Sequence, residues 1–345
     1  MEHSLPAQRL WAEMERTFQR PDASGVRTRT FHRHLHAMMR CTLTVDSGLG
    51  EELAHGLFAE RGGYDGWVRF SSAFFRSEWL PDAKGIAVKL LGVPGETCLP
   101  GTPGEQDFVM GNTPTVWFGT EALMMEYAQK VRSSMGASAT LRLTDTLPPG
   151  FLFPGRNPLK PRWNVVRLVA AHVWQSLAYR DPARFAYYSA TAFRLGEGAA
   201  KFCFRPAPAR AIRLSGGYVE RLKQRLDTGP VEFDFLVQPR TMPDAEPIDD
   251  ATVPWRSPWV RVGRLAIPPQ DFDTEERRKL GERISYSPWN CLTAHEPLGG
   301  VNAARRLAYG NSALNRNAMC PFHDPKPRDG GEDGISRPGP NAGSG

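Results

Sequence analysis

The segment Val231-Glu-Phe-Asp-Phe-Leu-Val-Gln238 alternates apolar and polar side chains along most of its length. Successive side chains of a strand point to opposite faces of a sheet, so this alternation predicts a strand with one buried face. Similar patterns predict further strands at residues 41–45, 66–71, 85–91, 106–112 and 259–267, and a hairpin of two strands around residues 196–198. We therefore expect an α+β fold, an antiparallel eight-stranded β-barrel with inserted and flanking helices.

Apolar residues at helical spacing predict the helices between and around these strands. They fall at residues 6–19, 50–59, 120–132, 163–177, 216–226, 273–282 and 300–316. The end of the chain is rich in Pro, Gly, Asp and Ser and has almost no apolar residues, which is typical of disorder. We expect an N-terminal helical arm at 1–24, one barrel domain at 25–320 and a disordered tail at 321–345.

The composition is that of an ordinary globular protein. Of the 345 residues, 41% are hydrophobic and 23% are charged, and the net charge is +6 without any block of Lys or Arg. Spread-out arginines argue against a dedicated nucleic-acid face and suit the recognition of carboxylates. The sequence predicts no signal peptide and no membrane span, and we expect a cytoplasmic protein.

Five cysteines are scattered along the chain, with no Cys-x-x-Cys pair: Cys41, Cys98, Cys203, Cys291 and Cys320. An odd and scattered set favours reduced thiols over a disulfide framework.

The expected helix at 300–316 carries an arginine and a tyrosine one turn apart, Arg305 and Tyr309. A guanidinium within about 4–6 Å of a phenol favours the phenolate, which otherwise needs a pH of about 10. A phenolate is a hard anionic ligand suited to ferric iron. A simple cation–π pair is the alternative interpretation of this spacing.

Three histidines at alternate positions, His32, His34 and His36, would share one face if they lie on a strand. A solvated basic edge and a transition-metal site are both consistent with this pattern.

Four separated segments together resemble the haem-binding motifs of the catalase superfamily, in the same order. They are Arg29-Thr-Phe-His32, Val68-Arg-Phe-Ser71 followed by residues 81–89, Asp107-Phe-Val-Met-Gly-Asn-Thr-Pro114, and Arg305-x-x-x-Tyr309 with Arg316. The Ser287-Pro-Trp-Asn290 turn and the run at residues 295–306 are most similar to the small, catalase-related haem peroxidase branch.

This resemblance implies a bound haem b with Tyr309, as a tyrosinate, ligating the iron, since tyrosine is the axial ligand of catalase haem. Arg305 would keep Tyr309 ionised, with Arg306 as the alternative. Arg29, Arg69 and Arg316 would pair with the haem propionates, because the planar guanidinium fork fits carboxylates. Arg184 and Tyr188 share the four-residue spacing, but on a strand they would lie roughly 13 Å apart.

The resemblance also implies three catalytic residues on the other side of the haem. His32 would move a peroxide proton as general base and then acid, Asn112 would donate a hydrogen bond to the peroxide, and Ser71 would orient His32. The sequence departs from the family's pattern at Phe31, His36 and residues 38–40, where catalases have smaller residues.

The expected function is that of a haem peroxidase acting on hydrogen peroxide or organic hydroperoxides, with a small organic electron donor and weak catalase activity. Lipid hydroperoxide isomerisation, non-catalytic haem binding or sensing, and a non-haem metal site at the three histidines are the alternatives. Exposed aromatic side chains on such a barrel would favour a homodimer.

Overall fold

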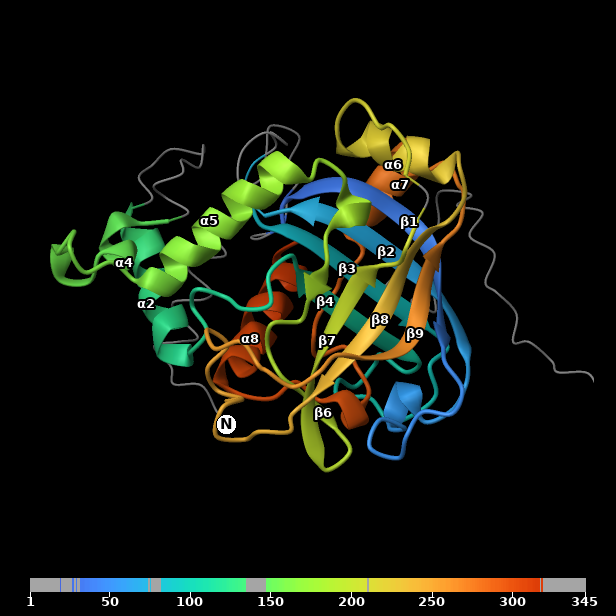
Figure 1. Cartoon of the computed structure of the whole chain (residues 1–345), viewed down its shortest axis with the longest axis horizontal. Coiled ribbons are helices and arrows are strands. Elements are labelled where there is room, and N and C mark those ends of the chain that lie inside the picture. Colours follow the sequence, from blue (N-terminus) through green and yellow to red (C-terminus); the bar gives the residue numbers. More distant parts are fainter. Residues whose placement is uncertain are drawn as a thin grey trace, which may run out of the picture.

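The alternating segments form one continuous antiparallel sheet in the computed structural model (Figure 1). Among the described residues its strands are β1 (His34–Val45), β2 (Gly63–Ser72), β3 (Lys84–Leu91), β4 (Glu105–Gly111), β5 (Tyr187–Tyr188), β6 (Phe193–Leu195), β7 (Gly198–Pro206), β8 (Val231–Pro239) and β9 (Val260–Ile267). The order is β5-β4-β3-β2-β1-β9-β8-β7, and β5 also pairs with β7. Eight strands therefore close into a barrel, as expected, and β6 extends the sheet beyond β7.

The structure describes residues 19, 27, 29, 32–73, 75, 82–134, 147–209, 211–316 and 318. Nearly all of the expected N-terminal arm (1–24), the expected helix at 6–19, Phe31, Cys320 and the tail at 321–345 lie outside these residues.

Aromatic side chains fill the inside of the barrel. In β8, Val231, Phe233, Phe235 and Val237 are buried while Glu232 and Asp234 are only partly covered, which confirms the alternation. The ring of Phe235 stacks on Phe204 with centroids 4.6 Å apart. The interior is thus a packed core, and a ligand site must lie outside it.

Helices and 3₁₀ turns connect and cover the strands. The helices are α2 (Glu121–Ser134), α4 (Pro149–Leu152), α5 (Trp163–Ala178), α6 (Tyr218–Leu226), α7 (Glu275–Arg283) and α8 (Gly300–Asn315), and the 3₁₀ turns are η1 (Gly56–Phe58), η2 (Pro154–Arg156), η3 (Pro182–Arg184) and η4 (Thr293–His295). The helix expected at 50–59 is wrong, because only η1 is helical there. Gly56 has φ +56°, outside the right-handed helical region, and packs against η4 so closely that a Cβ would lie 2.7 Å from Ala294.

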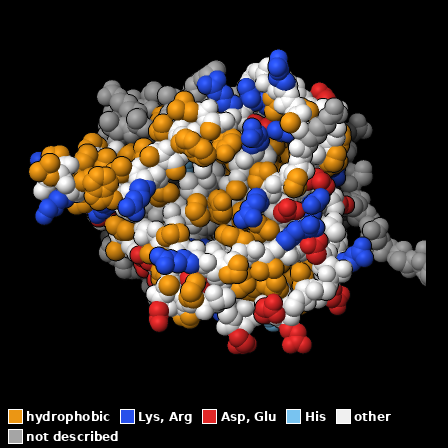
Figure 2. All heavy atoms as spheres, viewed as in Figure 1, with side chains coloured by type: hydrophobic (Ala, Val, Ile, Leu, Met, Phe, Trp, Pro, Cys, Tyr) orange, Lys and Arg blue, Asp and Glu red, His pale blue; other side chains and the backbone are white. Residues whose placement is uncertain are grey.

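A second, smaller core holds α8 beside the barrel. It joins Met124 and Tyr127 of α2, Val165 of α5, and Val301 and Ala304 of α8. Figure 1 shows α5 and α4 running away from the barrel next to this cluster. Hydrophobic side chains gather on that projection in Figure 2. In α5 and the segment before it, Leu159, Trp163, Trp174 and Leu177 are exposed.

A buried ion cluster connects β3, β4 and the turn before α8. The Lys89 ammonium contacts the carboxylates of Glu105 and Asp107, the latter at 2.8 Å, and all three side chains are almost fully buried. The Asn290 amide donates to both carboxylates. Burial raises the pKa of Asp107 to about 6 despite the neighbouring Lys89. The cluster fixes the turn at residues 287–290 against the barrel wall.

No helix in the part of the chain that the structure describes has both the length and the apolar character that crossing a bilayer requires.

Two buried histidines predict a loss of stability in mild acid. Burial lowers the pKa of His172, in α5, and of His295, in η4, to about 4 each. The unfolded chain takes up these protons near pH 6.5, whereas the folded chain stays neutral until about pH 4. Each imidazole therefore leaves the free energy of unfolding unchanged above pH 6.5 and lowers it as the pH falls towards 4. At pH 5 the decrease is about 2 kcal/mol per imidazole.

The measurement is urea unfolding at pH 7.5 and pH 5, for the wild type and for His172→Leu. Between pH 7.5 and pH 5 the free energy of unfolding of the leucine variant should fall by about 2 kcal/mol less than that of the wild type, because one titrating group is gone. Comparing the two proteins cancels the contribution of the other groups. An equal loss in both would show that His172 is not held neutral by burial.

Candidate functional site

Helix α8 presents Tyr309 at the side of the barrel. The helix begins after Gly299, where Asp249 Oδ1 accepts a hydrogen bond of 2.9 Å from the backbone N of Gly300. Its Asn302 side chain is fully buried and donates to the carbonyl of Ala192 at 2.8 Å. These contacts fix where the helix starts and which of its faces meets the barrel.

Arg305 lies next to Tyr309, as its spacing predicts. One of its terminal nitrogens donates to Thr191 Oγ1 and Asn302 Oδ1, both at 3.0 Å, which fixes the guanidinium. Its Cζ is 5.4 Å from the centroid of the Tyr309 ring. Arg306, the alternative partner, instead lies over the ring of Trp289, 4.9 Å from its centroid.

Three arginines from distant parts of the chain converge on the C-terminal end of α7. Arg29 Nη1 donates to the carbonyl of Gly281 at 2.8 Å, Arg69 Nε donates to the same carbonyl at 3.3 Å, and Arg316 Nη1 donates to the Glu282 carbonyl at 2.7 Å. The last carbonyls of a helix have no partner within the helix and carry its negative dipole end, so they attract such cations.

Gly281 allows α7 to sit close enough for this arrangement. A Cβ at Gly281 would lie 2.6 Å from the end of the Leu35 side chain and 3.3 Å from Met38 Cβ, both of β1, so a larger residue would force these side chains to shift.

Two of these arginines, Arg29 and Arg69, share one carboxylate, that of Glu282. Burial lowers the pKa of Arg29, and burial and then the charge of Arg29 lower that of Arg69 to about 9. Glu282 pairs with both, at 3.4 Å and 3.7 Å. Arg69 is almost fully buried, and its Nη2 has no hydrogen-bond partner among the described residues. Buried, under-neutralised guanidiniums of this kind favour an anionic ligand with several carboxylate oxygens.

His32 lies just before β1 and not on the strand, so the three histidines do not share one strand face. Its backbone is left-handed, with φ 53°, and β1 begins at His34. A bulge between Leu35 and Ala37 shifts the register further. His36 instead hydrogen bonds to Ser72 Oγ at 2.7 Å. Among the described residues, no group of three or more His, Cys, Asp or Glu side chains could hold a metal ion.

The His32 ring packs against Ser71 and Gly85. Its Nδ1 lies 3.3 Å from Ser71 Oγ, and a Cβ at Gly85 would come within 2.4 Å of the same nitrogen. Burial, followed by the charge of Arg69, lowers the pKa of His32 to about 3. The imidazole is therefore neutral at physiological pH.

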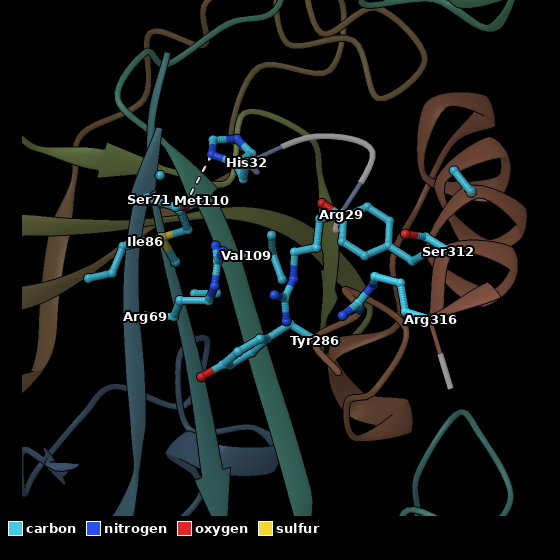
Figure 3. Close-up of a pocket in the computed structure, with 14 residues that line it drawn as sticks. Arg29, His32, Arg69, Ser71, Ile86, Val109, Met110, Tyr286, Ser312 and Arg316 are labelled. Atoms are coloured by element: carbon cyan, nitrogen blue, oxygen red, sulfur yellow. Dashed lines mark hydrogen bonds between the residues drawn. The ribbon is translucent and has the colours of Figure 1, made fainter. Parts of the chain in front are cut away.

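These residues surround one pocket with about 670 Å³ of empty space, part of it open to solvent (Figure 3). Barrel strands form one side and α8 the other. Among the residues named from the sequence, Arg29, His32, Arg69, Ser71, Tyr309 and Arg316 line it, together with Gly85, Ile86, Ala87, Val109, Met110, Tyr286, Ala308 and Ser312. The space in it that a water-sized molecule can reach is about 90 Å³, below the roughly 300–1,000 Å³ of small-molecule sites, so a larger ligand requires the walls to move apart. The walls are mainly apolar with few charged groups.

Asn112 does not line this pocket. Its amide nitrogen donates to Gln175 Oε1, and its amide oxygen accepts from the backbone N of Lys84 at 2.9 Å. The sequence spacing placed Asn112 correctly at the end of β4, but the side chain is already engaged by α5.

Sequence reasoning missed several residues of the site, above all Gly281, Glu282 and Tyr286. Tyr286 lines the pocket and its hydroxyl lies 3.7 Å from Met38 Sδ. The only sequence signal for it was its position directly before the turn at residues 287–290.

The described part of the chain can be superposed on solved catalase structures. A bacterial catalase matches with a TM-score of 0.60 at 16% identity, a fungal catalase with 0.64 at 13%, and catalase A from Saccharomyces cerevisiae with 0.62 at 14%. The chain has the catalase fold. Each match covers 86% of this chain but only 59%, 60% and 62% of those catalases, respectively.

No protein-family model and no curated protein sequence matches the chain. The catalase fold therefore rests on the structural matches, and the activity has to be argued from the pocket.

Proposed function

We propose that this protein is a haem-dependent peroxidase that reduces hydrogen peroxide or organic hydroperoxides at the expense of a small organic electron donor. The observation that carries this proposal is one pocket lined by Tyr309, the neutral His32 and three arginines. The coarser link to peroxide chemistry comes from the catalase fold.

The residues fit a haem group. Its two propionates suit Arg29 and Arg69, which share the single carboxylate of Glu282, together with Arg316, and its apolar ring suits walls such as Ile86 and Val109. Tyr309 supplies the phenol oxygen that would ligate the iron, with the Arg305 guanidinium fixed beside its ring. A bound haem would supply the electrons that reduce the O–O bond.

The proton transfer belongs to His32. The neutral imidazole accepts the proton of the incoming peroxide and returns it to the oxygen that leaves as water or alcohol. Ser71 holds Nδ1, which leaves Nε2 as the nitrogen for this transfer. Asn112 can hydrogen bond to the peroxide only if its amide releases Gln175.

Haem binding without peroxide turnover is the second candidate function. The engagement of Asn112 by Gln175 favours it, because the Asn112 amide is then not available to orient peroxide.

Replacing Tyr309 by Phe tests the proposal directly. We expect the wild type to show a strong Soret band and donor oxidation on addition of hydrogen peroxide or cumene hydroperoxide. Tyr309→Phe removes the only atom by which this side chain can ligate iron, so the band should be lost or shifted and the donor oxidation abolished.

Tyr188→Phe is the matched control, and it should leave both the band and the activity unchanged. A wild-type Soret band without turnover of either peroxide would favour haem binding alone. No Soret band after haem reconstitution would refute the haem proposal.

A further inference from the structure

Two cysteines that are far apart in the sequence, Cys98 and Cys291, face each other where the loop between β3 and β4 meets the segment just before η4. Thr97 forms an antiparallel bridge with Leu292, and the backbone N of Cys98 donates to the carbonyl of Cys291 at 2.8 Å. This register places Cys98 directly across from Cys291. Residues opposite one another in antiparallel strands have Cα atoms about 4.5–5.5 Å apart, which is within the range of disulfides.

The two sulfur atoms are already neighbours. The Cys291 thiol donates to Cys98 Sγ, with the sulfurs 3.7 Å apart, and both thiols are free. A disulfide needs about 2.05 Å, so small changes in the two side-chain torsions are sufficient.

The pair is chemically asymmetric. Cys98 is half-buried, and the hydrogen bond from Cys291, with smaller help from Arg306 and Arg194, lowers its pKa. Cys291 is fully buried, and the hydrogen bond to Cys98 and burial raise its pKa. Thiolate character and access make a cysteine reactive, so Cys98 has the character of an attacking thiol and Cys291 that of a resolving one.

We propose that Cys98 and Cys291 form a reversible dithiol–disulfide pair that peroxides oxidise. The Cys98 thiolate attacks one peroxide oxygen, the O–O bond breaks, and the other oxygen leaves with a proton as water or alcohol. The resulting sulfenic acid is attacked by the Cys291 sulfur, the S–O bond breaks, an S–S bond forms, and water leaves with the Cys291 proton. In total, the two thiols lose two electrons and two protons, and the peroxide takes them up to give two molecules of water, or one of water and one of alcohol.

The other described cysteines have neither the partner nor the access for this chemistry. Cys41 and Cys203 are buried, and burial raises the pKa of both, that of Cys203 to about 12. Among the four cysteines that the structure describes, the oxidation is therefore selective for the pair.

The disulfide would clamp the segment that leads into α8. Cys291 directly follows Asn290, which binds the buried carboxylates, and the backbone N of Leu292 donates to Gln106 Oε1 at 2.9 Å. A bond between Cys98 and Cys291 would join this segment covalently to the loop between β3 and β4. The clamp does not depend on haem binding, so the two proposals stand or fall separately.

The test uses the full-length purified protein, first reduced and then exposed to hydrogen peroxide. The peroxide is generated continuously by glucose oxidase, so that turnover at a haem does not exhaust it. Free thiols are then alkylated and non-reduced peptides are analysed by mass spectrometry. We expect one linked peptide pair containing Cys98 and Cys291, two hydrogen atoms lighter than the reduced peptides, and its loss on treatment with dithiothreitol.

Three variants sharpen the test. In Cys291→Ala the reaction should stop at the sulfenic acid of Cys98, which dimedone traps, and in Cys98→Ser no dimedone adduct should form at Cys291. Cys203→Ser is the matched control and should oxidise as the wild type does. In the wild type, Cys98 should react on the order of tenfold faster than Cys41 or Cys203.

Thermal unfolding gives a readout that is independent of chemical trapping. The oxidised wild type should unfold several degrees above the reduced wild type, since the bond closes a long loop, whereas Cys98→Ser should show no such difference. If no Cys98–Cys291 peptide forms, or if Cys98 reacts no faster than Cys203, the proposal is overturned.

Discussion

Replacing His32 by Gln is expected to lower the peroxidase kcat/KM by about 10²–10⁴-fold while the haem content stays unchanged. The imidazole lines the pocket, is neutral at physiological pH and has Nδ1 held by Ser71. Glutamine can still form a hydrogen bond, but it cannot accept and return a proton. Loss of kcat/KM with a normal Soret band is therefore the signature of a proton-transfer residue.

His36→Gln is the matched control. This histidine lies four residues after His32, and burial lowers its pKa to about 3, as it does for His32. Its ring, however, hydrogen bonds to Ser72 and lines a smaller hollow beside Tyr218. We expect His36→Gln to retain most of the activity. Steady-state kinetics of both variants decides the assignment, which fails if His36→Gln loses the activity and His32→Gln keeps it.

Replacing Lys89 by Met should destabilise the fold by about 3–5 kcal/mol, the usual cost of removing one partner from a buried ion cluster. The ammonium is fully buried between Glu105 and Asp107, and the substitution leaves these two carboxylates close together without a cation. Protonation of Asp107, whose pKa is about 6, relieves part of this repulsion. The loss should therefore be smaller at pH 5.5 than at pH 8.

Lys279→Met is the comparison on the surface. Lys279 pairs with Glu275 at 2.7 Å one turn away in α7, and both side chains are about 70% exposed (69% and 71%). Such a pair contributes about 0.3–0.5 kcal/mol. Urea unfolding of the two variants measures the difference, and a similar small effect for both would show that the buried cluster does not hold the turn at residues 287–290.

The strands of the barrel could be predicted from the sequence because each strand is marked by a pattern of residues within its own segment. A strand with one buried face must alternate, so residues 231–238 predicted β8, and residues 41–45, 66–71 and 259–267 predicted parts of β1, β2 and β9. The failed helix at 50–59 shows the limit of this reasoning. The apolar spacing was helical there, but Gly56 has a left-handed backbone and packs closely against η4.

Sequence spacing likewise predicts some features of the site and not others. The spacing of Arg305 and Tyr309 by itself determined that the two side chains are neighbours, because one helical turn separates them. Spacing could not reveal that Arg29, Arg69 and Arg316 meet at the end of α7, since helix carbonyls and Glu282 from another part of the chain collect them.

Long-range packing also determined which partners Asn112 and the cysteines contact. Asn112 stands where the resemblance expects it, yet Gln175, 63 residues away, holds its amide. The scattered cysteines indicated only reduced thiols, whereas a single antiparallel bridge brings Cys98 and Cys291, 193 residues apart, to 3.7 Å. The sequence alone determined which segments become strands and helices, because periodicity is a local property. Only the tertiary structure decided which distant side chains share a pocket, a charge or a bond, because closing the barrel fixes those distances.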